Sequence, residues 1–457
     1  MENCSRMTKS KLRIFARVFL LLCATVGVCV APAERAAGKT DQPQPGELKF
    51  VIIVSRHGVR SPTGTAEQLN QYSAQPWPNW DVPPGHLTAQ GARLMTLFGG
   101  YYRLYFAQQG LFRATGCADA AHVSFYSDSD QRTVETGKSL AAGMFPGCSP
   151  SEQSEQHALG EGDPDPLFHS LAAGIGHVDR DRATASVAGR IGNNPSAVTD
   201  AYRPQLEELQ RILLACPSSS PCPQPGHDAR TLLLGMPATL DRGKGDHLAE
   251  LKGPLNTAST ISEDFLLEYT DGMPMEQVGW GRVDLPTLKR LMDLHSAASD
   301  LTRRTSYLAT VQASNALAHI LDTLQQAASG KEVPGALGKL GDRVVVLTGH
   351  DTNLTNIAGV LNLNWIIDGR RDDTPPGGAL VFELRKRPET ENYEVSIHYT
   401  AQTLEQMRSL TPLTLDSPPA RANVFIPGCS TAGTNFPCDW KSFELALHSA
   451  IDPAFAQ

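Results

Sequence analysis

Two short apolar runs, far apart in the chain, constrain the fold more than any other feature of the sequence. The run FVIIV covers residues 50–54, and the run RVVVLTG covers residues 343–349. Continuous β-branched runs of this length are typical of strands buried on both faces of a sheet. Arg56 and His57 follow the first run, and His350 and Asp351 follow the second. Ligands of open α/β sheets bind beyond the carboxyl ends of the strands, so we expect both turns to line one crevice.

The segments between these runs predict helices and a second lobe. Thr88 is a candidate N-cap for an amphipathic helix, and HVSFYS at 122–127 alternates like a strand before another helical pattern. From about 150 to 300, helical patterns are separated by Pro-, Ser- and Gly-rich loops, and strand patterns return after residue 343. We therefore predict an α/β fold, in which a central mixed sheet is flanked by helices and carries an inserted, mainly helical lobe.

The N-terminus reads as a targeting segment. Basic residues precede the apolar stretch FLLLCATVGVCVA, and Ala31-Pro32-Ala33 offers a small-residue cleavage site. The stretch is shorter than the roughly 20 residues of a membrane span, although a retained anchor is the alternative. We expect residues 1–33 to be a signal peptide, 34–46 a linker and 47–457 the catalytic unit, with no membrane contact after cleavage.

The cysteines agree with export to a periplasmic or secreted location. Outside the leader there are six, and six cysteines allow fifteen pairings. Their grouping into near neighbours suggests the pairs 117–148, 216–222 and 429–438. No CxxC or Cys/His zinc spacing is present, which favours disulfides over a metal site. The formal net charge of −8 provides no general basic field, so a nucleic-acid partner is not expected.

The residues of the predicted crevice suit phosphoryl chemistry. Arginine forks match phosphate oxygens and stay charged at any working pH. A histidine among arginines should have a lowered pKa, and a neutral imidazole is a competent nucleophile. A nearby aspartate could protonate the leaving alkoxide. Because the arginines supply the positive charge, no metal or other cofactor is expected.

The motif RHGVRSPT, together with the downstream GHDTN, resembles the histidine acid phosphatase family, especially its bacterial periplasmic phytase and glucose-1-phosphatase branch. DSDQRT, DPLF at 165–168, GMPMEQVGWGR and TPPGGALVFE are also similar to that branch, and the resemblance spans roughly residues 47 to 440. It implies the phosphoglycerate-mutase-like histidine phosphatase fold. It also implies an acid phosphomonoesterase that works through a phosphohistidine.

The resemblance assigns roles to individual residues. His57 corresponds to the nucleophile and Asp351 to the proton donor for the leaving group. The residues that correspond to phosphate-binding positions are Arg56, Arg60, Thr63, Arg132, His350 and Thr352.

Substrate identity depends on a departure from the family pattern. Phytases of this branch usually carry a lysine after the threonine, whereas this chain has Gly64. Phytate is the leading expected substrate, and glucose-1-phosphate or other sugar phosphates are the alternative. The expected partners are therefore small phosphate esters, and the expected form is a monomer.

Other interpretations remain. Arg56, Arg60 and Arg132 could be surface charges, His57 a core histidine, and Asp351 a helix cap. Glu263 could reach the pocket or lie on a solvated helix face. His86 is expected in a loop, and Asp163 with Asp165 is a weak calcium signal. At the level of function, a phosphate-binding protein without turnover and a mutase are the competitors. No GxxxxGK[ST], HExxH or GxSxG motif is present to support nucleotide, zinc-protease or serine-hydrolase chemistry.

Overall fold

The computed structural model describes residues 46–148, 159–217, 222, 231–388, 390 and 392–457. The predicted signal peptide 1–33, and the predicted linker up to residue 45, lie outside the described residues. Among the helices that are described, none combines the length and the apolar composition that a membrane span requires.

A mixed sheet forms the centre of the fold, in the order β10-β9-β8-β1-β5-β2, with β11 paired to β9. The two apolar runs lie in β1 (Glu47–Arg56) and β5 (Val344–Gly349), which are parallel and in register from Val51 opposite Val344 to Arg56 opposite Gly349. On the other side of β5 lies β2 (Val123–Ser127), also parallel. The antiparallel part consists of β8 (Ala379–Lys386), β9 (Tyr393–Ala401), β10 (Ala420–Val424) and β11 (Cys438–Asp439).

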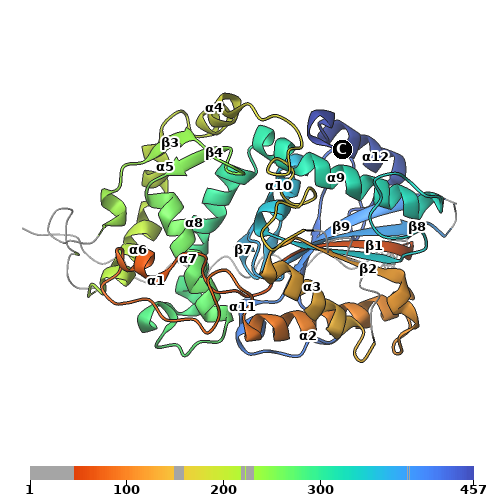
Figure 1. Ribbon diagram of the computed structural model, residues 1–457, viewed down its shortest axis with the longest axis horizontal. Helices are drawn as coiled ribbons and strands as arrows, with labels where there is room; N and C mark the ends of the chain where they lie inside the picture. Colours follow the sequence, from red (N-terminus) through yellow and green to blue (C-terminus); the bar gives the residue numbers. More distant parts are fainter. Residues whose placement is uncertain (1–45, 149–158, 218–221, 223–230, 389, 391) are drawn as a thin grey trace, which may run out of the picture. The chain divides into compact units, whose positions relative to one another are not determined.

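Helices cover both faces of this sheet, as the apolar runs predict (Figure 1). Phe50, Ile52 and Val54 of β1 pack in one core with α9 (Ser306–Ser329), α10 (Asp351–Leu361) and α12 (Trp440–Ala450). Val51 and Ile53 face the opposite side and pack with α2 (Ala89–Gln108) and α3 (Gln131–Met144). Each fully buried Val or Ile stabilises the fold by ~1.5–3 kcal/mol, which accounts for the apolar run over residues 50–54 of β1.

The start of α2 holds the loop that follows His57. Thr88 is its N-cap, as predicted, and accepts a hydrogen bond from the Gly91 amide at 2.9 Å. The amide of Thr88 donates to the carbonyl of Val59 at 3.0 Å. A Cβ on Gly91 would lie 2.2 Å from the same carbonyl oxygen, so only glycine permits this approach. The helix thereby fixes the backbone next to Arg60.

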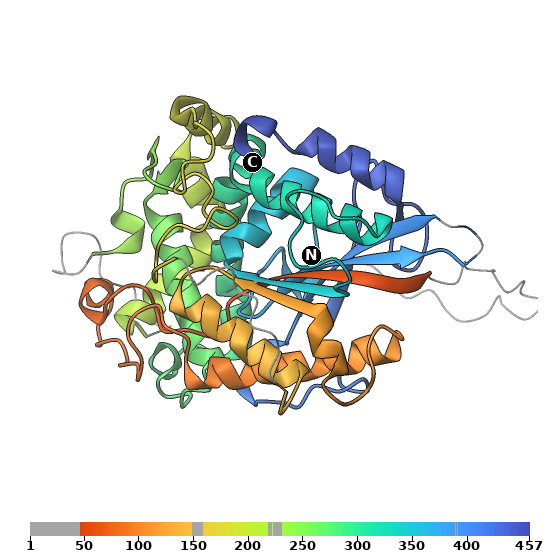
Figure 2. The ribbon, with the colours of Figure 1, turned by 45° about the vertical axis from the view of Figure 1, so that its right-hand side comes forward.

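A mainly helical region lies beside the sheet (Figure 2) and contains a second hydrophobic core. It is formed mainly by α6, α7 and α8, with α1 and α11 packed against it. This mainly helical region also contains a hairpin of β3 and β4, which the sequence patterns did not indicate. A second short pair, β6 and β7, follows α10. The bounds are α1 Ala66–Asn70, α4 Arg180–Arg190, α5 Pro195–Ala201, α6 Arg203–Leu214, α7 Pro254–Thr270, α8 Leu285–Arg303, α11 Leu404–Arg408, β3 Thr239–Arg242, β4 Ala249–Lys252, β6 Ile366–Ile367 and β7 Arg370–Arg371.

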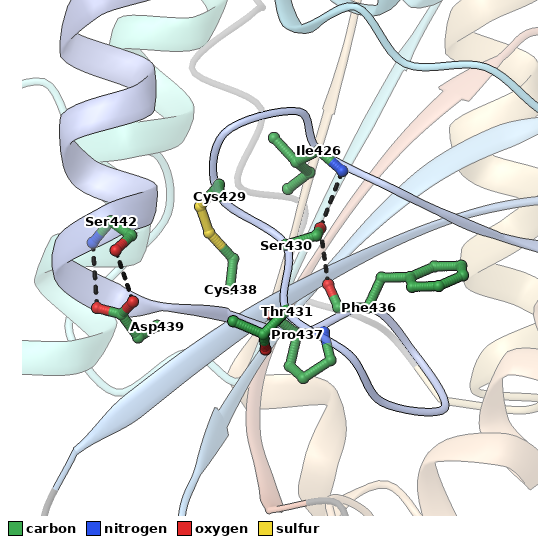
Figure 3. The surroundings of a disulfide bond; sticks show 9 residues. All are labelled: Ile426, Cys429, Ser430, Thr431, Phe436, Pro437, Cys438, Asp439 and Ser442. Atoms are coloured by element: carbon green, nitrogen blue, oxygen red, sulfur yellow. Dashed lines mark hydrogen bonds between the residues drawn. A yellow bond between two sulfur atoms is a disulfide. The ribbon is translucent and has the colours of Figure 1, made fainter.

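Three disulfides tie down loops, and their pairing confirms the prediction from near neighbours: Cys117–Cys148, Cys216–Cys222 and Cys429–Cys438. In the last, Cys438 begins β11, and Cys429 lies in the preceding loop (Figure 3). Ser430 braces the same loop, because its hydroxyl accepts from the amide of Ile426 and donates to the carbonyl of Phe436, both at 2.9 Å. Closing the 31-residue separation of the first disulfide stabilises the fold by on the order of 3–4 kcal/mol.

Candidate active site

Three parallel strands deliver polar side chains to one edge of the sheet. Arg56 ends β1 and is followed by His57, His350 follows β5, and Asp128 follows β2. The backbone continues the sheet pairing into the turns: the His57 amide donates to Gly349 O at 2.8 Å, and the Asp128 amide donates to Thr348 O at 2.9 Å. Because α10 and α3 begin directly after β5 and β2, their N-termini point at the same edge.

A cavity of about 390 Å³ opens at this edge. Of the predicted site residues, it is lined by His57, Arg60, Thr63, Arg132, His350, Asp351 and Thr352. The exception is Arg56, which lies fully buried behind the lining. The other lining residues come from the loop at 168–171, the β3–β4 loop, α8, α9 and α10, and none of them was predicted as a site residue: Phe168, His169, Ser170, Leu171, Asp246, His247, Arg303, Gln312, Asn353 and Asn356.

His57 is buried and held in a single tautomer. Its Nδ1 lies 2.8 Å from Gly58 O. A carbonyl oxygen only accepts, so Nδ1 carries the proton and Nε2 keeps its lone pair. Burial, followed by the positive charges of Arg56 and Arg60, lowers the pKa of His57 well below its usual value. His57 is therefore a neutral imidazole with an unprotonated Nε2.

Glu263 on α7 joins the two motif arginines. Its Oε1 contacts Nη2 of Arg56, and its Oε2 lies 3.3 Å from Nη2 of Arg60. Arg56 also donates from Nη1 to Thr374 O at 2.6 Å. Burial alone would raise the pKa of Glu263, but Arg60 and Arg56 lower it below its usual value. With a side chain only 14% exposed, Glu263 does not lie on a solvated helix face, and that alternative is wrong.

Arg132 lies in the first turn of α3, between an acidic and a basic neighbour. Its Nη2 is 2.5 Å from Asp130 Oδ2 and 3.4 Å from His350 Nδ1. His350 donates from Nε2 to Asp128 Oδ2 at 2.5 Å, which leaves Nδ1 as an acceptor for Arg132. Burial lowers the pKa of His350, and the positive charge of Arg132 lowers it further.

His169 connects the sheet edge to the helical region, and sequence reasoning missed it. Its Nε2 is 2.9 Å from Asp128 Oδ2, and its Nδ1 is 2.7 Å from Asp246 Oδ2. Burial would lower the pKa of His169, but hydrogen bonds to Asp128 and Asp246 raise it to about 10. Asp128 could have been found from the sequence, because it follows a predicted strand in the way that His57 and His350 do. His169 and Asp246 are in loops, and no sequence pattern indicated them.

We expect His169→Asn to destabilise the protein more in acid than in base. The raised pKa means that the charged His169 stabilises the fold fully below about pH 6.5, and that this contribution is lost as the pH rises towards 10. Loss of the cation between two carboxylates should lower the free energy of unfolding by about 3 kcal/mol at pH 5.

Urea unfolding at pH 5 and pH 9.5 measures this difference. His448→Asn, at an exposed histidine of α12, is the control and should change stability little at either pH. An equal loss for His169→Asn at both pH values would show that the charge does not matter.

Asp351 begins α10 and faces the cavity, with Oδ2 at 4.0 Å from His295 Nε2. Burial would raise the pKa of Asp351, but Arg56, His295 and His350 outweigh burial and hold the pKa below its usual value. In the free site Asp351 is thus a carboxylate. The N-cap of α10 is His350, so Asp351 is not the cap of that helix.

Two groups of side chains have donor atoms close enough for a divalent cation: Asp128, His169 and His350, and Glu263, His295 and Asp351. In the first, Asp128 already accepts from both histidines. In the second, Glu263 is neutralised by two arginines. The positive charge of the arginines around both groups opposes a further cation.

The remaining predicted residues have local roles. His86 lies in the loop before α2, with Nε2 at 3.7 Å from Glu161. Asp165 is buried and accepts from the Leu167 amide at 2.8 Å and from a tyrosine hydroxyl at 2.9 Å. Asp163 accepts from the Gly160 amide at 2.7 Å. Within the described residues, neither aspartate belongs to a group suited to a metal, so the calcium signal gains no support.

The sequence profile of the histidine phosphatase superfamily (branch 2) matches residues 47–221 and 248–400. The chain belongs to this superfamily. Phytase AppA of Escherichia coli (strain K12) is 34% identical to this histidine phosphatase over 411 residues, which cover 89% of the chain and 93% of the relative. Glucose-1-phosphatase of Providencia rettgeri is 26% identical over 442 residues, which cover 95% of the chain and 99% of the relative.

Solved structures agree with the sequence relatives. The apo form of Hafnia alvei phytase superposes on this histidine phosphatase with a TM-score of 0.80 at 33% identity, covering 91% of this chain and 99% of the other. The complex of that phytase with myo-inositol hexakis sulphate gives the same TM-score and identity, covering 91% of this chain and 100% of the other. The predicted fold class and family are confirmed, and the chain is a phosphoric monoester hydrolase.

Proposed function

We propose that this histidine phosphatase is an exported phytase, which hydrolyses phosphate monoesters of myo-inositol through a phosphohistidine at His57. The observation that carries the proposal is the neutral His57, whose unprotonated Nε2 belongs to a cavity lined by Arg60 and Arg132. The same positive charges that keep the imidazole neutral attract a dianionic phosphoryl group. Residues 47–457 would act as one catalytic unit.

In the proposed first step, Nε2 of His57 forms a bond to phosphorus while the bond from phosphorus to the ester oxygen breaks. Arg60 and Arg132 hold the equatorial oxygens, and Arg56 adds positive charge from behind the lining. Thr63, His350 and Thr352 complete the phosphate-binding wall. The departing oxygen takes a proton from Asp351, and the alcohol leaves.

Asp351 needs a proton for that step, although it is ionised in the free site. Its low pKa depends on nearby positive charges, Arg56 above all. A bound phosphate dianion offsets those charges and repels the carboxylate, so the pKa of Asp351 rises when substrate binds. We infer that an acidic medium then supplies the proton. In the second step, water attacks phosphorus, Asp351 takes a proton from the water, and inorganic phosphate leaves as His57 is restored.

Two groups of relatives support different substrates. Likeness to E. coli phytase AppA and to Hafnia alvei phytase favours phytate, and likeness to glucose-1-phosphatases favours a sugar phosphate. Gly64 follows Thr63 of the cavity lining, and because glycine has no side chain it supplies no cation there. Phytate remains the leading substrate because the phytases are the more similar relatives.

Export is supported by the N-terminal pattern of residues 1–33 and by three disulfides, which persist in oxidising compartments. We place the protein in the periplasm or outside the cell, and we expect it to be a monomer.

Kinetics on a panel of phosphate esters at mildly acidic pH test the proposal. We expect turnover of p-nitrophenyl phosphate, phytate and glucose-1-phosphate, with the highest kcat/KM on phytate. A higher kcat/KM on glucose-1-phosphate would favour the sugar-phosphate alternative. If binding occurred without turnover of any ester, the chain would be a phosphate-binding protein and the proposal would fail.

A further inference from the structure

Arg303 differs from the other arginines around the cavity in having no carboxylate partner within the part of the chain that the structure describes. Arg60 is paired with Glu263, and Arg132 is paired with Asp130. Among the described residues, no Asp or Glu oxygen forms an ion pair with Arg303. Its contacts are the Asp246 carbonyl, 3.5 Å from Nη1, and His247 Nδ1, 3.2 Å from Nη2. Such a guanidinium can donate to a ligand without giving up an ion pair.

Arg303 lines the same cavity as Asp351, the residue that would protonate the departing alcohol. It is close enough to Asp351 for its charge to lower the pKa of that carboxyl. If Asp351 protonates the departing oxygen, the rest of the alcohol must lie on the Asp351 side of the cavity. Arg303 ends α8, and His247 lies in the β3–β4 loop, so both belong to the helical region rather than to the sheet edge.

His247 adds a hydrogen-bond donor next to Arg303 in the cavity lining. Because its Nδ1 accepts from Arg303, its Nε2 carries the proton when the ring is neutral. Burial and the charge of Arg303 lower the pKa of His247, which favours the neutral ring. The carboxylate of Asp246, in the same wall, is bonded to His169 and thereby offset. Burial also lowers the pKa of Arg303, but a guanidinium stays charged in acid medium.

We propose that Arg303 and His247 form a second anion subsite, which binds a phosphate on the alcohol part of the substrate and so favours esters with more than one phosphate. The inference rests on the proposed function, because it uses Asp351 to define the leaving side. It assigns substrate selection to the helical region, in which Arg303 provides a cation that Gly64 does not provide.

Inhibition of p-nitrophenyl phosphate hydrolysis tests the subsite. Inorganic phosphate probes the catalytic position, and myo-inositol hexakissulfate probes both positions. For Arg303→Gln, we expect the Ki of the hexakissulfate to rise about tenfold, as for the loss of a charge-assisted hydrogen bond, and the Ki of phosphate to change less than twofold. Likewise, kcat/KM should fall about tenfold more on phytate than on p-nitrophenyl phosphate.

Two further variants serve as controls. Arg303→Lys keeps the charge and should recover part of the affinity for the hexakissulfate. Arg290→Gln removes the same charge from α8 at an exposed residue, paired with Glu208 at 2.6 Å, and should leave both Ki values unchanged.

Equal effects of Arg303→Gln on both inhibitors, or no inhibition of the wild type by the hexakissulfate, would overturn the subsite while leaving the phosphatase mechanism intact. Absence of turnover on every phosphate ester would instead overturn the proposed function itself.

Discussion

Replacing His57 by alanine is expected to lower kcat on every phosphate monoester by at least about 10⁴-fold, as for the loss of other enzymatic nucleophiles. No other side chain in the cavity combines a neutral imidazole with an unprotonated nitrogen that lacks a partner. His350 is bonded through Nε2 to Asp128, and its Nδ1 faces Arg132. His169 is held at both nitrogens by carboxylates. Neither can take over the attack on phosphorus.

Acid-sensitive, alkali-stable labelling of the protein by ³²P-phosphate ester gives a second readout for the same variant. Wild-type protein should carry a phosphoramidate after a rapid quench, and the His57→Ala variant should carry none. His448→Ala removes an exposed histidine on α12 and should retain both labelling and turnover. A His57→Ala protein that melts like the wild type and keeps more than a tenth of its turnover would contradict the mechanism.

The second large effect concerns Asp351 and depends on the leaving group. Asp351→Asn cannot protonate the departing oxygen, so kcat/KM on phytate, an alkyl phosphate, should fall about 10³-fold. On p-nitrophenyl phosphate the leaving phenolate needs no proton, and kcat/KM should fall at most about tenfold. The parameter kcat/KM is the right one, because it covers only the steps up to release of the alcohol.

The pH profile checks the same residue. In the wild type, Asp351 must be protonated in the substrate complex, so kcat on phytate should decline as the pH rises. This decline should be absent in Asp351→Asn. Equal losses of kcat/KM on phytate and on p-nitrophenyl phosphate would mean that Asp351 acts in binding or folding and not as the proton donor.

Much of the fold was accessible from local patterns. FVIIV and RVVVLTG predict strands buried on both faces, and the structure places them side by side in β1 and β5. The near-neighbour grouping of the cysteines predicts the three disulfides. The hairpin of β3 and β4 was missed because each strand has only four residues, which is too short for a clear alternating pattern, and because β3 is largely exposed.

The sequence by itself determined the chemistry at the strand ends. Periodicity identifies a buried strand, and the residue after a buried parallel strand must face the same sheet edge as its neighbours. His57, Arg60, His350 and Asp351 could therefore be grouped before any coordinates were known. The family resemblance added Arg132, whose place in the first turn of α3 is by itself uninformative.

Only the tertiary structure decided the state and the surroundings of that chemistry. The pairing of Glu263 with Arg56 and Arg60, the position of His169 between Asp128 and Asp246, and the contacts of Arg303 with the β3–β4 loop all join segments that are distant in sequence. Such contacts depend on how the helical region packs beside the sheet, and the local periodicity of a chain contains no record of that packing. Charge and burial, which set the pKa values of His57 and Asp351, arise only from this arrangement.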